Sequence, residues 1–332
     1  MRRRSLLLVV GACLATLSLT VGSALADPVS PPGPPDGPER ALVGVGAETT
    51  QGLLNALSDI IKDGGGNKII ASYDNGPPGT ITTKNRPACT ITRPNQGGAG
   101  TNALVASKQA NDGCVQFSRV VTNDAAARPG TGLVYIPVAT DALTYAIRDD
   151  STIPRNLSLA QLTDIYNCRV PSVKPLLGVF GAGNRTFFLA RLGITDRIDL
   201  VTTPGFTCIK DTDADGNPLL ANDGRLLTDP AQIVTYSSAP YLAQVNKVVT
   251  DKHGKAVLGS INGIGPAVLN AESVMSRDVY NVIDKAKLND PTTNSVFVGS
   301  GSRVCAETAT IKRQGFNLNP NCGSTTIQST GP

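Results

Sequence analysis

Gln96-Gly-Gly-Ala-Gly-Thr101 and Gly181-Ala-Gly-Asn-Arg185 each stand directly before a segment of helical composition, Asn102-Ala-Leu-Val105 and Thr186-Phe-Phe-Leu189. Glycine lets a ligand approach the backbone closely, and the first turn of a helix presents free N–H groups with a partial positive charge. One such loop says little about function, because glycine-rich turns before helices are common in α/β proteins. Two of them, from different halves of one chain, favour a fold in which both loops close on one small anion.

Strand-like and helix-like segments alternate on both sides of these loops. Short apolar runs predict strands at residues 41–45, 68–73, 133–138, 140–147, 256–261 and 279–283. Apolar spacing and capping residues predict helices over 53–61, after Ser158-Leu-Ala-Gln161, over 238–245 and over 303–314, with Gly315 as the C-cap. The alternation predicts an α/β architecture with mostly parallel sheets.

The first 26 residues have the pattern of a secretory signal peptide. Arg2, Arg3 and Arg4 precede an apolar run, and Ala24-Leu-Ala26 is a small-residue cleavage site. We expect cleavage after Ala26 and a secreted or cell-surface protein whose residues 27–40 form a proline-rich leader. A lipoprotein site at Cys13 is the alternative, but it leaves only five apolar residues before the cut. The paired arginines allow twin-arginine export as well as the general secretory route.

Charge and hydropathy exclude several kinds of partner. Without the three arginines of the signal peptide, 27 of the 30 basic residues remain against 26 acidic ones. A chain so close to neutral, with no basic stripe, has no long-range attraction for nucleic acid or for an anionic membrane surface. No second apolar stretch approaches the length of a membrane span, so we expect no membrane span in the mature chain.

Six cysteines remain after the signal peptide, an even number that predicts three disulfides in an exported protein. Six cysteines allow fifteen connectivities. Pairing between sequence neighbours closes moderate loops, and we favour it: Cys89 with Cys114, Cys168 with Cys208, and Cys305 with Cys322.

Residues for catalysis or metal binding are scarce. His253 is the only histidine, and its surroundings predict an exposed turn rather than a general base. Asp211, Asp213 and Asp215 imitate the start of a calcium loop, but Pro218 and Asn222 stand where an apolar residue and a bidentate glutamate belong. A polar hairpin tip is the preferred interpretation. We therefore expect a protein that is not an enzyme and has no cofactor or resident metal.

Polar residues at the ends of two predicted strands add to the glycine loops. Thr49 and Thr50 follow the first strand, and Ser118 and Arg119 end a later one. Ligands of open α/β sheets bind at the carboxyl ends of the strands. Arg119 and Arg185 offer the charge and fork geometry that suit an oxyanion, and isolated surface arginines are the alternative for both.

The chain resembles the phosphate-type substrate-binding proteins of bacterial ABC importers, especially actinobacterial secreted forms, over about residues 41 to 325. Six segments carry the resemblance: Gly44-Val-Gly-Ala-Glu-Thr-Thr-Gln51, Arg93-Pro-Asn-Gln-Gly-Gly-Ala-Gly100, Gly113-Cys-Val-Gln-Phe-Ser-Arg119, Gly181-Ala-Gly-Asn-Arg-Thr-Phe-Phe-Leu189, Ser276-Arg-Asp-Val-Tyr-Asn-Val-Ile283 and Val296-Phe-Val-Gly-Ser-Gly-Ser302.

The resemblance implies a two-lobed type II periplasmic-binding fold, with each lobe a mostly parallel sheet flanked by helices. Lobe 1 would comprise 41–138 plus 277–332 and lobe 2 would comprise 139–276, joined by crossing strands near 133–145 and 279–283. It implies a monomer that holds a small-molecule or inorganic anion, phosphate first, and works with an ABC permease. The implied ligand-binding residues are Glu48, Thr49, Thr50, Gly97, Gly98, Ala99, Gly100, Ser118, Arg119, Ala182, Gly183, Asn184 and Arg185.

Several positions depart from the family pattern. The second loop has Gly178, Phe180, Ala182 and Asn184 where the family has arginine, aspartate, serine and threonine, and Glu48 falls near the family's threonine. An added carboxylate beside fewer donors disfavours a dianion. The alternative function is therefore a secreted or cell-surface interaction protein that keeps the fold and has lost phosphate binding.

Overall fold

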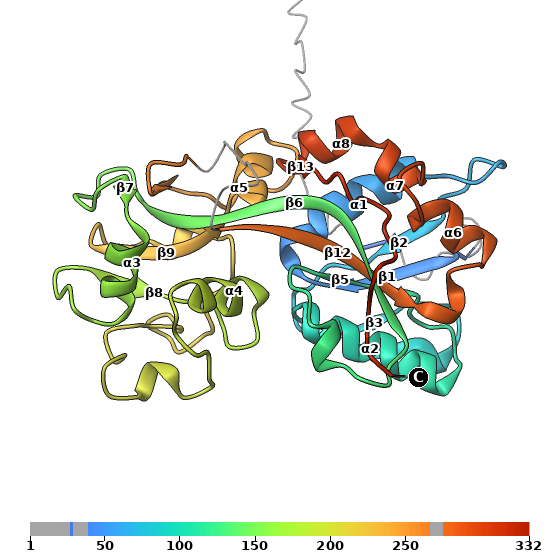
Figure 1. Cartoon of the computed structure of the whole chain (residues 1–332), viewed down its shortest axis with the longest axis horizontal. Helices are drawn as coiled ribbons and strands as arrows, with labels where there is room; N and C mark the ends of the chain where they lie inside the picture. Colours follow the sequence, from blue (N-terminus) through green and yellow to red (C-terminus); the bar gives the residue numbers. More distant parts are fainter. Residues whose placement is uncertain (1–26, 29–38, 266–274, 332) are drawn as a thin grey trace, which may run out of the picture.

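The computed structural model describes residues 27–28, 39–265 and 275–331 of the 332-residue chain. The expected signal peptide, 1–26, and most of the proline-rich leader lie outside the described residues. The described chain forms two lobes that two long strands connect (Figure 1). Within these described ranges, no helix has both the length and the apolar character needed to cross a membrane.

One ten-stranded sheet runs through both lobes in the order β2-β1-β5-β12-β6-β9-β8. Its strands along this path are β2 (Ile70–Ser72), β1 (Leu42–Gly46), β5 (Phe117–Val120), β12 (Ser276–Asp284), β6 (Leu133–Arg148), β9 (Gln232–Ser237) and β8 (Lys174–Leu176). Three more strands pair with β6: β10 (Ala256–Leu258), β13 (Asn317–Leu318) and β14 (Ile327–Gln328). Two small sheets join β3 (Thr80–Thr82) with β4 (Thr90–Thr92) and β7 (Asn156–Leu157) with β11 (Ser260–Ile261).

Strands β6 and β12 connect the lobes. The first half of β6 pairs antiparallel with β12, and its second half pairs antiparallel with β9 and β10. The register of β12 shifts between Val279 and Tyr280, opposite Pro137 and Ala139 of β6. A proline has no N–H for the ladder, which explains an irregularity at this point.

The predicted α/β fold is confirmed, but the sheet is mixed rather than mostly parallel. Parallel pairing joins β1 to β2 and β5, and β8 to β9. The other pairs of the large sheet are antiparallel, because β6 and β12 run in opposite directions between the two lobes.

The helices cover the faces of this sheet: α1 (Gln51–Ile60), α2 (Gly97–Ala110), α3 (Leu159–Tyr166), α4 (Gly183–Arg191), α5 (Ser238–Val245), α6 (Pro291–Phe297), α7 (Arg303–Ala306) and α8 (Thr308–Arg313). Both glycine-rich loops open helices as predicted, and α5 has its predicted bounds. The helix expected over 303–314 is interrupted at Glu307, whose ψ of 50° is not helical. The strand expected over 256–261 divides at Gly259, where the ring of Tyr145 leaves no room for a side chain.

Each lobe has its own apolar core. In the lobe of β1, one cluster lies between the sheet and α1, α6 and α8, and another lies on the face that α2 covers. In the other lobe, α3 and α4 pack their Leu162 and Phe188 against β6 and β9. The segments that meet between the lobes are therefore held in place by two separate apolar cores, one in each lobe.

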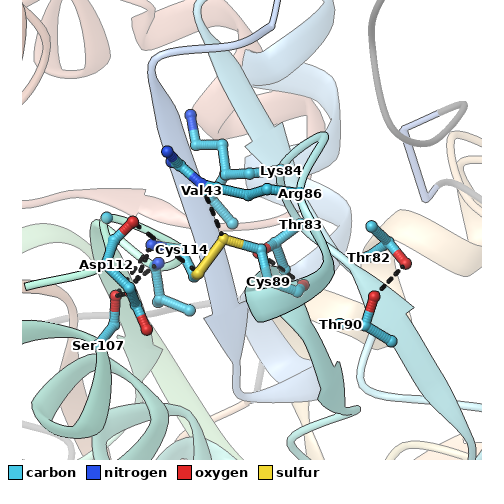
Figure 2. The surroundings of a disulfide bond; sticks show 12 residues. Val43, Thr82, Thr83, Lys84, Arg86, Cys89, Thr90, Ser107, Asp112 and Cys114 are labelled. Atoms are coloured by element: carbon cyan, nitrogen blue, oxygen red, sulfur yellow. Dashed lines mark hydrogen bonds between the residues drawn. A yellow bond between two sulfur atoms is a disulfide. The ribbon is translucent and has the colours of Figure 1, made fainter. Parts of the chain in front are cut away.

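The three predicted disulfides are confirmed: Cys89–Cys114, Cys168–Cys208 and Cys305–Cys322. Figure 2 shows the first of them beside Ser107 and Asp112. The hydroxyl of Ser107 and the carboxylate of Asp112 both accept from the Cys114 N–H, at 3.0 and 2.8 Å. This disulfide thus anchors the loop that leads into β5.

Candidate functional site

A small pocket lies between the lobes. Its volume is about 10 Å³, which is room for roughly one water molecule. Segments from both halves of the chain line it: Ala47, Glu48, Thr49, Gln96, Val121, Ala182, Gly183, Asn184 and Ala221.

Three helix beginnings meet at this pocket. Ala47 precedes the 3-10 turn Glu48–Thr50 that leads into α1, Gln96 precedes α2, and Ala182 precedes α4. None of these three cap residues accepts a hydrogen bond from its helix through a side chain. Side chains cap α3, α6 and α7, at Ser158, Asp290 and Ser302. Helices α5 and α8 also begin without a side-chain cap, but they contribute no residue to the pocket lining, so the pocket is marked by the meeting of three such ends. The uncapped ends leave N–H groups with partial positive charge at one place, which suits an anion.

Glycines make the close approach of these helices possible. A Cβ on Gly100 would lie 2.6 Å from the Cα of Gly46, and one on Gly183 would lie 2.5 Å from a methyl carbon of Val121. Contacts this short force a neighbour to move. The glycines therefore fix the distance between each helix end and the strand or loop behind it.

Side chains from the two lobes bond directly across the pocket. The hydroxyl of Thr49 donates to Asn184 Oδ1 at 3.1 Å. The side-chain amide of Asn222 donates to Glu48 Oε2 at 2.5 Å and lies 3.4 Å from the Thr49 hydroxyl. The lobes are thus closed on each other by the protein's own polar groups.

Asn222 is a member of the site that sequence reasoning missed. Its φ of 55° lies in the left-handed region, which asparagine tolerates better than most residues. Its Oδ1 accepts from the Ser237 N–H at 2.9 Å, and its backbone carbonyl accepts from the Tyr236 hydroxyl and the Gln244 side chain. These bonds hold the side-chain amide of Asn222 toward the opposite lobe.

A second missed feature is a buried ion pair between the crossing strands. Arg277 of β12 donates to Asp141 of β6 at 2.9 Å, and the same Nη2 donates to Asn184 Oδ1 at 2.5 Å and to the Ser237 hydroxyl at 2.9 Å. Burial lowers the pKa of the Arg277 guanidinium, and Asp141 opposes this shift. The pair connects Asn184, which lines the pocket, with the strands β6 and β12 that join the lobes. The sequence signal that could have revealed the pair is a charged residue, Asp141 or Arg277, inside an otherwise largely apolar strand.

The carboxyl group of Glu48 has a pKa well above the ordinary value for glutamate. Burial raises the pKa of Glu48 to about 7, although the hydrogen bond from Asn222 and the charge of Lys252 act in the opposite direction. Asp223 and Asp141 add to the rise. Glu48 therefore changes its charge near neutral pH, at the junction of the lobes.

Ser118 and Arg119 lie behind the pocket rather than in its lining. The Ser118 hydroxyl lies 3.2 Å from the hydroxyl of Thr101, a buried residue of α2. The guanidinium of Arg119 donates to the Ser72 hydroxyl and the Tyr73 carbonyl, both at 2.7 Å. Its positive charge is therefore used to join β5 to β2, and burial lowers its pKa to about 10.

Arg185 is also committed to partners inside its own lobe. It pairs with Asp196 at 2.8 Å and with Asp211 at 3.0 Å, and it donates to the carbonyl groups of Gly178 and Arg197. Its charge is balanced by the two carboxylates. It fixes the loop before α4 instead of facing the pocket.

The remaining candidates flank the pocket. Thr50 is buried, and its hydroxyl has no hydrogen-bond partner. Gly97, Gly98, Ala99 and Gly100 form the first turn of α2, directly after the lining residue Gln96. Of the residues expected at the site, five line the pocket: Glu48, Thr49, Ala182, Gly183 and Asn184.

Two carboxylates of the calcium-like segment, those of Asp211 and Asp213, bond to other groups of the protein. Asp213 Oδ1 accepts from the N–H groups of Asp215 and Asn217, at 2.9 and 2.8 Å, while Asp211 pairs with Arg185. No group of three or more potential ligands able to hold a metal ion exists in the part of the chain that the structure describes. His253 lies in a turn beside Asp251, away from the pocket lining.

Comparison with known proteins supports the architecture alone. No family model and no curated protein matches the chain. An ABC-type phosphate transport receptor from Vibrio cholerae has a similar structure, with a TM-score of 0.54, 12% identity, and coverage of 84% of this chain and all of that one. A putative phosphate ABC transporter substrate-binding protein from Clostridium perfringens has a TM-score of 0.52, 13% identity, and coverage of 84% and 99%. The chain therefore has an α/β fold with a mixed sheet, similar to that of type II periplasmic binding proteins.

Proposed function

We propose that this chain is an exported solute-binding protein that holds a small anion between its two lobes, 41–138 plus 277–332 and 139–276. The convergence of three uncapped helix beginnings on one pocket between the lobes carries the proposal. Backbone N–H groups at helix ends bind anions without a positively charged side chain. The role is binding rather than catalysis, and an ABC permease would be the partner of the monomer.

The charges around the pocket favour a singly charged ligand. Arg119, Arg185 and Arg277 are all engaged by groups of the protein, so none of them is free to pair with a ligand. Glu48 adds a carboxyl group that repels a dianion once it has lost its proton. Phosphate remains the first ligand to test, because the two similar structures are described as phosphate transport components.

Binding requires the lobes to separate. The closed pocket has room for about one water molecule, which is less than any oxyanion needs. The bonds from Thr49 to Asn184 and from Asn222 to Glu48 would give way to bonds with the ligand. Hinge motion of lobes around a bound solute is a common way to achieve this exchange.

Titration calorimetry of residues 27–332 with phosphate, sulfate and a phosphate monoester, at pH 5.5 and pH 7.5, tests the proposal. Saturable binding that is stronger at pH 5.5 is expected. Ala182→Asp places a carboxylate at the uncapped start of α4 and should abolish binding. Ala160→Asp adds a carboxylate at an exposed position in the first turn of α3 and should bind as the unmodified chain does. Because Ala182 is buried, the urea unfolding midpoint of Ala182→Asp is measured as well, and it should show a folded protein.

One observation favours a second function. The side chains of Asn184, Asn222 and Glu48 already satisfy one another across the closed pocket. An interaction protein that has lost its ligand would keep such a closed cleft. Absence of saturable binding for every anion at both pH values would remove the transport role. Retention of the same protein partner by the Ala182→Asp variant would then support the interaction role.

A further inference from the structure

The lobe of β1 holds the carboxylate of Asp27, the first described residue of the chain. Arg93 binds this carboxylate with both terminal nitrogens: Nη1 donates to Oδ1 at 3.0 Å, and Nη2 donates to Oδ2 at 2.6 Å. The N–H of Asp74 donates to the same Oδ1 at 2.7 Å. None of these three residues lines the pocket between the lobes. A bidentate arginine together with a backbone donor is a strong way to bind a carboxylate.

This carboxylate site is built into the lobe. The side chain of Arg93 is only 9% exposed, and its Nη1 also donates to the carbonyl of Asp74 at 2.8 Å, which fixes the guanidinium. Pro28, which follows Asp27 directly, is buried. Burial lowers the pKa of Arg119, and the charges of Asp74 and Asp27 oppose this shift. The carboxylate of Asp27 therefore lies in the field of a second arginine.

Asp27 has a special place in the sequence, because it follows Ala26, the expected cleavage site. Cleavage there makes Asp27 the N-terminal residue of the exported protein. The ends of a chain are poorly ordered unless contacts tie them down. Here the ion pair of Asp27 and the burial of Pro28 are two such contacts.

The far end of the proline-rich leader is attached to the same lobe. Glu39 accepts from the N–H of Asn85 at 3.0 Å and pairs with Lys84 at 3.3 Å. The guanidinium of Arg40 donates to the carbonyl of Ile70 at 3.0 Å. Both described ends of the leader are therefore bound to the lobe of β1.

We propose that the lobe of β1 carries a binding site for the N-terminal residue of the exported chain, an aspartate whose carboxylate is held by Arg93 and by the Asp74 N–H. The occupant is the chain's own end, recognised as a carboxylate followed by a proline ring. Arg93 lies three residues before Gln96, which precedes α2 and lines the pocket, so the docked end also fixes the segment that leads into the pocket. The site requires the cleavage expected after Ala26 and is independent of the solute that the pocket binds.

Release of Asp27 by an aminopeptidase that removes a residue preceding proline tests this assignment. The substrate is the folded chain of residues 27–332, and a peptide of residues 27–36 gives the rate for a free end. A docked end must leave its site before the enzyme can bind it. Release from the protein should therefore be slower by a factor on the order of ten, the effect of hydrogen bonds between charged groups.

Arg93→Gln keeps the N-terminal sequence and removes the bidentate partner. Asp27 should then be released nearly as fast as from the peptide. Arg169→Gln is the matched control, because Arg169 is an exposed arginine of the other lobe that pairs with Asp164. This control should keep the slow release of the unmodified chain.

A second measurement follows the Asp74 N–H by NMR and leaves Arg93 in place. Asp27→Asn removes the charge that this N–H faces, so the Asp74 signal should shift. Asp36→Asn removes a carboxylate elsewhere in the leader and should leave the signal unchanged.

Four results would overturn the proposal. Equal release from the protein and the peptide would show that the end is free. Slow release that persists in Arg93→Gln would assign the protection to Pro28 alone. An Asp74 signal that is the same in Asp27→Asn would show that its N–H does not bind the carboxylate. N-terminal sequencing of the exported protein that finds another first residue would show that Asp27 is not the end of the chain.

Discussion

The charge of Glu48, which bonds to Asn222 of the opposite lobe, makes the stability of the protein depend on pH. The ordinary pKa of a glutamate is near 4.5, and burial raises that of Glu48 to about 7. Between these values the folded protein holds a proton that the unfolded chain has lost. The contribution of Glu48 to stability is therefore largest below about pH 4.5 and declines as the pH rises toward 7.

Replacement of Glu48 by glutamine should remove this dependence. Glutamine has nearly the same shape, still accepts from Asn222 and carries no charge at any pH. Between pH 4.5 and 7.5 the unmodified protein should lose on the order of 1 kcal/mol of unfolding free energy relative to Glu48→Gln, after allowance for partial exposure. Urea unfolding of both proteins across this range measures the difference. A difference that stays constant with pH would contradict the assignment.

At the same scale, sequence reasoning found only part of the site. The glycine loops and Thr49 were predictable, because helix ends and strand ends have local patterns. Arg277 and Asp141 are 136 residues apart, and Asn222 and Glu48 are 174 residues apart. No local pattern reports contacts over such separations. The partners of Arg185, Asp196 and Asp211, lie 11 and 26 residues further along the chain, and no local sequence pattern pairs them with it.

Helix beginnings divide into two kinds in this molecule. In α3, Ser158 accepts from the Gln161 N–H, and the Gln161 side chain accepts from the Ser158 N–H, which forms a complete capping box. The helices α2 and α4 begin without any side-chain cap. The capped ends stabilise the fold, whereas the uncapped ends leave their N–H groups to other partners.

Removal of the cap should cost stability without any effect on the pocket. Ser158→Ala should lower the unfolding free energy by about 1 kcal/mol, because the Gln161 N–H loses its acceptor, the Ser158 hydroxyl. Ser172→Ala, at an exposed position outside any helix, is the control and should change it little. Equal midpoints for the two variants in urea unfolding would show that the capping box contributes nothing.

The elements themselves were largely predictable, and their pairing was less so. Strand β1 and helix α3 follow from apolar runs and a capping sequence, which act over a few residues. The direction of β12 beside β6 depends on how the chain returns between lobes, which no segment encodes alone. The break at Gly259 likewise depends on the ring of Tyr145, more than a hundred residues earlier.

On the scale of the whole molecule, Asn222 fastens one lobe to the other. Its side chain supplies bonds to Glu48 and Thr49 across the pocket, while its backbone stays within its own lobe. Loss of these bonds leaves both apolar cores intact. The expected effect is therefore a change in the distribution of closed and open forms rather than unfolding.

Asn222→Gly should open the protein in the absence of ligand. Glycine accepts the φ of 55° and has no side chain to cross the pocket. Loss of about 2 kcal/mol of bonds would move the closed-to-open ratio by roughly thirtyfold, and small-angle X-ray scattering should show a larger radius of gyration. Asn111→Gly, also left-handed but exposed at the end of α2, should leave the radius unchanged. Identical scattering curves for the two variants would exclude a fastening role for Asn222.

The disulfides join segments separated by 25, 40 and 17 residues, and every one lies on a single side of the hinge. Each disulfide therefore constrains one lobe by itself, and none of the three joins one lobe to the other. Motion of one lobe relative to the other would therefore not depend on whether the three disulfides are oxidised or reduced. If the chain binds a solute between its lobes as proposed, mild reduction of the disulfides should leave the opening of the pocket unchanged.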